Sequence, residues 1–150
     1  MTYQIIYSSE SSTPMQMDEL EEILEHARSS NSAKGITGAL VYVEGIFLQI
    51  LEGEMKSIKN LMTRISSDVR HETVTVLKEG EISSAIFSDW TMAYVGATPE
   101  QVAQWAGLRE TTAVPEILTN LRQDPNKATQ VAKSILSVLT SEHIAQTKPQ

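Results

Sequence analysis

One amide side chain stands in surroundings where a polar group is unexpected. Gln49 is the single polar residue in the apolar run 46–51, and strand alternation places it on the same face as Phe47 and Leu51. A buried amide without a partner costs about 1–3 kcal/mol. Gln49 must therefore bond a backbone group, face solvent at the hairpin, or take part in the chemistry of a site.

Tyr7 is the second residue of interest. It ends a short β-rich run at 3–8 and shares a face with Ile5. A tyrosine at a strand end is usually a packing residue with one hydrogen bond. Its phenol is also one of the few side chains that donate an electron and then a proton, so a redox role stays open beside the structural one.

Three further features have both a structural and a functional interpretation. Asn31 continues the apolar face of the helix predicted before it, either as a C-terminal residue or as a polar group aimed between helix and sheet. Residues 68–71, Asp-Val-Arg-His, form a solvated helix end or an anchor for the ribityl or phosphate part of a ligand. Trp90 and Met92 share one face of a predicted strand, as core or as cofactor contacts.

Several classes of chemistry have no basis in this sequence. The chain has no cysteine, so thiol catalysis and thiolate metal sites are excluded, and its three histidines are scattered without metal-ligand spacing. It contains no glycine-rich dinucleotide or phosphate-binding motif and no nucleophile elbow. We therefore expect neither a metal site nor an enzyme.

The charge distribution and the hydropathy of the chain limit the classes of partner that it could bind. Residues 1–96 hold 7 Lys and Arg against 14 Asp and Glu, whereas residues 97–150 hold 5 of each. An acidic front half is a poor surface for nucleic acid or anionic membrane. With neither a signal peptide nor a membrane-length apolar run, we expect a cytoplasmic protein.

Hydrophobic periodicity predicts the elements that position these residues. The predicted order is strand, helix, strand, strand, helix, strand and strand, at residues 3–8, 17–31, 36–43, 46–51, 54–68, 73–78 and 87–95. The first six give the α+β ferredoxin-like βαββαβ arrangement, with both helices on one sheet face. The fifth strand is an addition.

The remainder of the chain changes character. We expect residues 1–96 to form one domain and residues 97–150 a helical extension, with helices at 99–108, 114–122 and 126–143. The last helix carries an apolar stripe at Val131, Ile135, Val138 and Leu139. We expect this stripe to cover the open sheet face and to contribute to oligomer contacts.

Taken together these residues resemble the BLUF family, blue-light sensors that use FAD. The matching segments cover about residues 1–95 in the family's order; they are Tyr7 in Ile-Ile-Tyr-Ser-Ser, Asn31 with the Gly-Ile-Thr-Gly of 35–38, the run 47–54, Asp68-x-Arg70-His71, and Trp90-Thr91-Met92. The match does not extend into residues 97–150, which are similar to the helical extension of short family members.

The resemblance implies a flavin site between the two helices. The cofactor is FAD, with FMN as the alternative, and the implied binding residues are Tyr7, Ile23, Asn31, Gln49, Ile65, Asp68, Arg70 and His71. Asn31 would bond the polar edge of the ring, and residues 68–71 would lie near the ribityl–phosphate side. The implied photoactive set is Tyr7, Gln49, Trp90 and Met92.

The resemblance also implies a mechanism without substrate turnover. Light drives electron and proton transfer from Tyr7, and the hydrogen bonds of Gln49 rearrange. The change passes through the strand that carries Trp90 and Met92 to the C-terminal helices, and on to a signalling partner or a homo-oligomer. The alternatives are a flavin-dependent oxidoreductase, a small ferredoxin-like hydrolase, or a ligand-binding module without a photocycle.

Overall fold

A computed structural model describes residues 2–11, 16–67, 71–109 and 113–146. The elements are β1 (Thr2–Ser11), α1 (Met17–Lys34), β2 (Thr37–Val43), β3 (Ile46–Gly53), α2 (Met55–Ser67), β4 (His71–Ile82), β5 (Ala93–Gly96), α3 (Pro99–Trp105), α4 (Val114–Gln123) and α5 (Pro125–Gln146). The described strands form one sheet in the order β4-β1-β3-β2-β5. Only the β2–β5 pair is parallel. The predicted ferredoxin-like core with an added fifth strand is confirmed.

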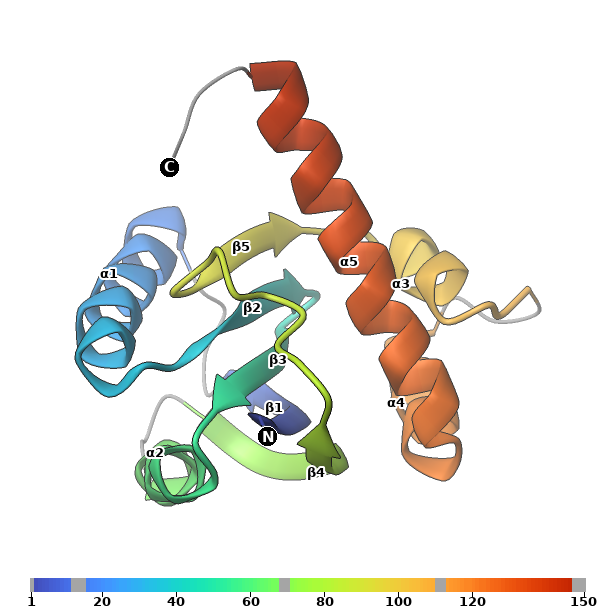
Figure 1. The fold of residues 1–150 in the computed structure, drawn as a ribbon. Helices are drawn as coiled ribbons and strands as arrows, with labels where there is room; N and C mark the ends of the chain where they lie inside the picture. The colour runs from blue at the N-terminus through green and yellow to red at the C-terminus, as the bar shows by residue number, and fades with distance from the viewer. Residues whose placement is uncertain (1, 12–15, 68–70, 110–112, 147–150) are drawn as a thin grey trace.

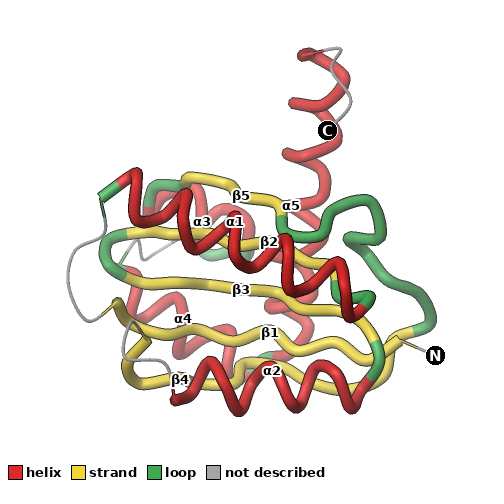
Figure 2. The backbone as a smooth tube through the Cα atoms, turned by 90° about the vertical axis from the view of Figure 1, so that its left-hand side faces the viewer, coloured by secondary structure: helices red, strands yellow, loops and turns green. Residues whose placement is uncertain are grey.

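Helices cover the sheet on both faces. Helices α1 and α2 lie on one face, and α3, α4 and α5 lie on the other (Figures 1 and 2). Strand alternation divides the buried side chains accordingly. In β1, Ile5 belongs to the cluster beneath α1 and α2, whereas Ile6 belongs to the cluster beneath the C-terminal helices. The sheet therefore has no open face.

Local sequence sets both ends of α1. A capping box between Gln16 and Glu19 satisfies backbone donors at its start. At its end, Gly35 takes a φ of 68°, in the left-handed region that glycine adopts without a steric penalty. The helix is three residues longer than predicted, because the chain turns only at this glycine.

The last strand of the sheet is much shorter than predicted. We expected a strand over 87–95, but β5 spans only Ala93–Gly96, and residues 83–92 form bends and turns. The backbone of this segment bonds to other groups instead of a ladder. The Trp90 N–H donates to the Phe87 carbonyl at 3.0 Å, and the Phe87 N–H donates to the Glu52 carboxylate at 2.8 Å. The large apolar side chains that suggested a strand pack on two different faces, Phe87 and Trp90 on one and Met92 on the other.

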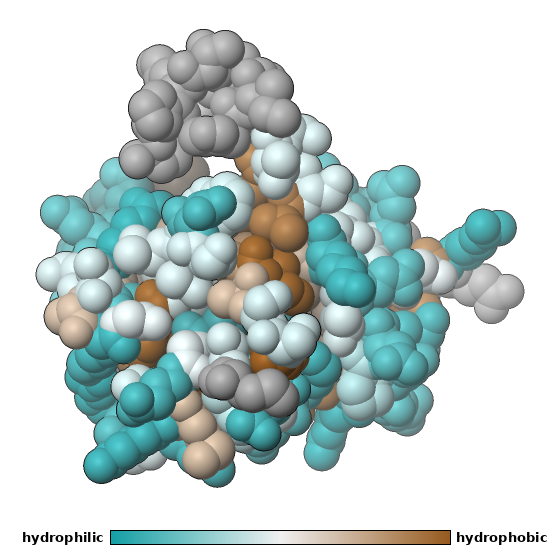
Figure 3. All heavy atoms as spheres, viewed as in Figure 1, coloured by the Kyte–Doolittle hydropathy of each residue, from teal (hydrophilic) through white to brown (hydrophobic). Residues whose placement is uncertain are grey.

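The apolar stripe of α5 packs on the sheet, as predicted. Val131, Ile135 and Leu139 are buried there, and Val138 packs against the same cluster. Residues 97–146 thus share one hydrophobic cluster with the sheet, so the division at residue 96 stays a prediction about sequence rather than a visible boundary. Figure 3 shows hydrophobic side chains reaching the surface in a narrow band beside α5. Of the described helices, none is both long and apolar enough to span a membrane.

Truncating Ile135 tests how far the sheet depends on α5. Its side chain is fully buried, so Ile135→Ala leaves a cavity and should lower the free energy of unfolding by about 2–5 kcal/mol. Denaturant titration measures this change. Ser137→Ala, at an exposed position of the same helix, is the matched control and should stay near the parent value. Equal stability of the two variants would contradict the packing described.

Tyr3 makes stability depend on pH in the alkaline range. Its hydroxyl donates to the Glu79 carboxylate, and this bond, then burial and then the charge of Glu79 raise the pKa of Tyr3 from 10.0 to about 12. The folded protein therefore holds this proton more tightly than the unfolded chain does. The resulting stability is fully present below pH 10 and is lost as the pH rises toward about 12.

Urea titrations of the parent chain and of Tyr3→Phe, at pH values from about 9 to about 12, isolate this contribution. The difference in unfolding free energy between them should shrink as the pH rises, because the phenylalanine variant lacks the titrating proton. A difference that stays constant across the range would disprove the assignment.

Candidate functional site

Tyr7 and Gln49 form a direct hydrogen-bonded pair at the centre of the sheet. They are register partners of the antiparallel strands β1 and β3. Tyr7 is fully buried, Gln49 is 7% exposed, and the Tyr7 hydroxyl donates to Gln49 Oε1. Because both side chains are buried, this bond satisfies the Tyr7 donor and the Gln49 acceptor.

The other end of the Gln49 amide has a much weaker partner. Gln49 Nε2 lies 3.3 Å from the Met92 sulfur, and a thioether is only a weak acceptor. Rotating the amide by half a turn would set its oxygen against that sulfur, with no donor between them. Because the Tyr7 hydroxyl could also accept from an N–H, it is the contact with the Met92 sulfur that favours this orientation of the amide. An acceptor offered by a ligand would compete with Met92 for the Gln49 N–H.

A cavity of about 130 Å³ lies directly beside Gln49. Side chains of α1 and α2 and of the underlying strands surround it; they are Ile23, His26, Ala27, Ser30, Asn31, Leu40, Phe47, Gln49, Leu61, Arg64, Ile65 and Met92. Its walls are largely apolar, and amides stand on the strand side and near the end of α1. The structure thus brings five predicted site residues to one cavity: Ile23, Asn31, Gln49, Ile65 and Met92. Tyr7 lies behind Gln49 and does not line it.

Asn31 is buried at the end of α1 and is 2% exposed. Its side-chain Nδ2 donates to the Thr91 carbonyl at 3.3 Å, and its backbone carbonyl accepts from the Ile36 N–H at 2.9 Å. One turn earlier, Arg28 Nε donates to the Met92 carbonyl at 2.9 Å. Asn31 therefore does more than end a helix, because it links α1 to the backbone that carries Met92.

Gly38 brings the same segment against β2. Its N–H donates to the Trp90 carbonyl at 3.0 Å. A Cβ at this position would lie 1.9 Å from the Ile50 carbonyl oxygen, so only glycine fits. The Gly-Ile-Thr-Gly run thus combines a helix stop at Gly35 with a close backbone approach at Gly38.

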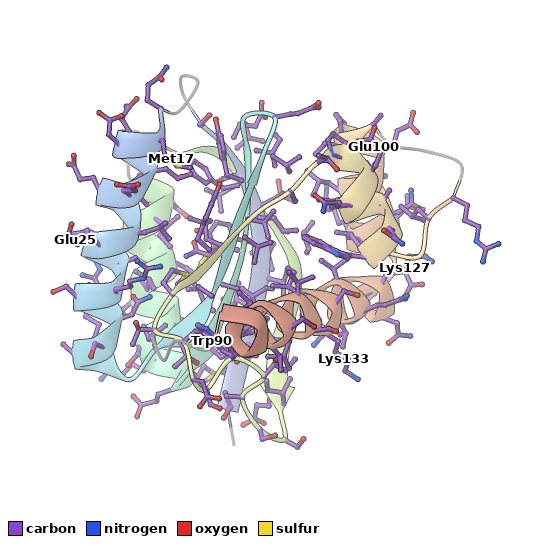
Figure 4. All side chains as sticks on the ribbon, turned by 90° about the horizontal axis from the view of Figure 1, so that it is seen from above. Met17, Glu25, Trp90, Glu100, Lys127 and Lys133 are labelled. Atoms are coloured by element: carbon purple, nitrogen blue, oxygen red, sulfur yellow. The ribbon has the colours of Figure 1, made fainter. Side chains whose placement is uncertain are left out.

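Trp90 and Met92 do not share a face, contrary to prediction. Met92 is buried in the cluster under α1 and α2, whereas Trp90 packs against the cluster of the C-terminal helices (Figure 4). The cause is that residues 90–92 belong to a bend rather than a strand, so alternation does not apply. Trp90 is absent from the cavity lining, while its carbonyl is anchored on β2.

The predicted anchor at residues 68–71 is largely untested. Asp68 and Arg70 lie outside the described residues, and of His71 only the backbone is described, where it starts β4 opposite Ser11. Their part in holding a ligand stays a prediction.

One histidine and one arginine at the cavity were not predicted. His26 and Arg64 line it from α1 and α2. Helical spacing contains the signal, since His26 is three residues beyond Ile23 and Arg64 is three residues beyond Leu61. Within the described residues, no group of three or more His, Asp or Glu side chains is arranged to hold a metal ion.

The family comparison agrees with this geometry. The model of the BLUF family, sensors of blue-light using FAD, matches residues 2–93, which include both Tyr7 and Gln49. The chain therefore belongs to the BLUF family of flavin-binding blue-light sensors.

Individual relatives are larger signalling proteins or compact BLUF proteins. The chain is 34% identical over 107 residues to the photoactivated adenylate cyclase subunit beta of Euglena gracilis, covering 71% of this chain and 12% of that protein. Among solved structures it is similar to BlsA in its ground state, with a TM-score of 0.66 and 30% identity over 75% of this chain and 76% of that one. The dark-state structure of BlrB shares the fold, with a TM-score of 0.72, 22% identity, and coverage of 91% of this chain and 96% of that one.

Proposed function

We propose that this chain is a blue-light receptor that holds FAD in the cavity between α1 and α2 and uses Tyr7 and Gln49 as its light-responsive pair. The observation that carries the proposal is the hydrogen-bonded series from Tyr7 through Gln49 to Met92, which ends at the cavity. If Tyr7 and Gln49 served only to stabilise the fold, the weak contact between Gln49 and the Met92 sulfur would not be needed.

The lining of the cavity suits a flavin ring. Ile23 from α1 and Ile65 from α2 supply apolar walls for the two faces of a flat ring. Asn31 and Gln49 supply amides for its polar edge, and either amide both donates and accepts. Arg64 lines the same cavity from α2 and offers a cation to an anionic tail. FAD is the ligand in the family's description, whereas a related structure, BlrP1 of Klebsiella pneumoniae, holds FMN.

The protein residues respond by rearranging hydrogen bonds. A bound flavin supplies a strong oxidant when it absorbs blue light. Tyr7 gives up an electron, and its phenolic proton moves along its hydrogen bond toward Gln49 Oε1. When the electron and proton return to Tyr7, the Gln49 amide is left rotated or tautomerised, with a new bond toward the ring. No substrate is consumed, so the chain acts as a sensor rather than an enzyme.

The signal leaves the site through the segment that carries Met92. A Gln49 amide that turns away from the sulfur removes a contact with this segment. Two residues before Met92, Trp90 packs on the cluster that contains α3, α4 and α5. We infer that these helices present the signal to a partner protein or to a second copy of the chain, since light-regulated relatives carry effector domains such as an adenylyl cyclase.

The absorption spectrum before and after blue light tests this function. The purified chain should show a flavin spectrum that shifts to longer wavelength on illumination and returns in the dark. Tyr7→Phe keeps the ring volume but loses the hydroxyl bonded to Gln49, so it should bind flavin and lose the shift.

Other outcomes distinguish the competing functions. A colourless protein contradicts flavin binding, and bleaching to reduced flavin in the presence of a substrate favours an oxidoreductase. A flavin spectrum unchanged by light favours a ligand-binding module. If the shift survives in Tyr7→Phe, the electron donor is another residue.

Filling the cavity tests the location of the flavin. Ala27 lines the cavity, so Ala27→Trp should reduce the flavin content of the purified protein by about tenfold, because the indole takes the space of the ring. Glu25→Trp is the matched control, since Glu25 is exposed and projects outward from α1 (Figure 4). The ratio of flavin absorbance to protein absorbance measures the flavin content of both variants. Full flavin content in Ala27→Trp would place the ligand elsewhere.

A further inference from the structure

A second buried polar network lies on the sheet face opposite the cavity. Gln4 and Glu52 are register partners on β1 and β3, only 1% and 0% exposed. They alternate with Ile5 and Leu51, which face α1 and α2, so Gln4 and Glu52 face the C-terminal helices. A buried carboxylate is costly unless it is bonded and compensated. The photoreceptor function described above makes no use of either side chain.

Each polar atom of this network has one partner. Lys78 Nζ donates to Gln4 Oε1 at 2.7 Å, and Gln4 Nε2 donates to Glu52 Oε2 at 2.9 Å. The second oxygen, Glu52 Oε1, accepts from the Phe87 N–H at 2.8 Å. The series runs from a cation on β4 through an amide on β1 to a carboxylate on β3. Its direction fixes the orientation of the Gln4 amide.

The last bond of the series fixes the start of the segment that reaches the cavity. Phe87 is fully buried, and five residues later Met92 contacts the Gln49 amide. Between them the backbone is held by Gly38 at the Trp90 carbonyl and by Asn31 at the Thr91 carbonyl. Without Glu52, the segment is anchored only at its Met92 end. A shift at Phe87 then moves the backbone that sets the Met92 sulfur on Gln49.

We propose that Glu52 is a positioning residue for the Gln49 switch. Its carboxylate fixes Phe87 and thereby the register of residues 87–92, and Lys78 compensates its charge through Gln4. This assignment rests on the proposed function only for its effect on the light response, because the anchoring itself exists in the dark.

The C-terminal helices adjoin the same network. Burial lowers the pKa of Lys78, the charge of Glu52 opposes this, and Lys133 of α5 lowers it further. Lys133 lies on α5, in the middle of the helix (Figure 4).

Two variants separate positioning from simple packing. In Glu52→Gln the new amide bonds either Phe87 or Gln4 correctly but leaves two N–H groups facing each other in the series. The exchanged pair Gln4→Glu with Glu52→Gln restores every bond: Lys78 and the amide at position 52 donate to the carboxylate at position 4, and the amide oxygen accepts from Phe87. Net charge and side-chain volume are the same as in the parent chain.

The first measurement is hydrogen exchange in the dark. In Glu52→Gln the Phe87 amide should exchange about tenfold faster or more, because either an N–H replaces its acceptor or the repulsion at Gln4 pushes the new amide away from it. The Met92 methyl resonance should move as well, because the sulfur leaves Gln49. The exchanged pair should restore the Met92 signal and most of the Phe87 protection, since an amide oxygen replaces the carboxylate as the acceptor. Neither signal depends on light, so the result of this measurement is independent of whether the proposed photoreceptor function is correct.

The second measurement is the rate of dark recovery after blue light. Glu52→Gln should change it by several-fold, and the exchanged pair should return it. Ile6→Val is the control, since Ile6 is a buried residue of the same sheet face that makes no bond to the network. A parent-like Phe87 amide in Glu52→Gln overturns the proposal. An effect of Ile6→Val equal to that of Glu52→Gln also overturns it. So does an exchanged pair that fails to restore Phe87 protection, and this last test holds even if Glu52→Gln alone does not fold.

Discussion

The antiparallel register of β1 and β3 is the constraint on which the site depends. It sets Tyr7 opposite Gln49, and both strands are covered on both faces. A slip of one residue would turn every side chain to the other face and leave a buried phenol and a buried amide without partners. The same register sets Gln4 opposite Glu52 three positions away. One pairing therefore creates a polar couple on each side of the sheet.

The segment before β5 connects these two sides. It starts at Phe87, bonded to Glu52 on the face of the C-terminal helices, and it ends at Met92, in contact with Gln49 on the cavity face. Trp90 between them packs with the helices. A regular strand would hold its side chains by alternation alone. This segment is instead held by individual hydrogen bonds from Glu52, Gly38 and Asn31.

The helical extension is part of this design rather than an appendage. Its buried stripe closes the second sheet face, and Lys133 acts electrostatically on Lys78. In light-regulated relatives the BLUF region occupies a small part of a larger protein, and this chain spans 12% of the cyclase subunit it matches. In this chain α5 packs directly on the sheet that carries Gln49.

The sequence by itself determined the order of the elements, because apolar residues recur with a period of about 3.6 in the long helices and of about 2 in the strands. It also identified Gln49 as a polar residue among apolar neighbours. It also singled out Asn31, as a polar residue on the apolar face of the first helix, and Met92, through the resemblance. It failed at residues 87–92, where the large apolar side chains Phe87, Trp90 and Met92 suggested a strand. Only the tertiary structure decided that Glu52, Gly38 and Asn31 take the backbone bonds of that segment. The reason is that these partners lie 35 to 60 residues away along the chain, and no local pattern encodes a bond between groups that meet only after the sheet has formed.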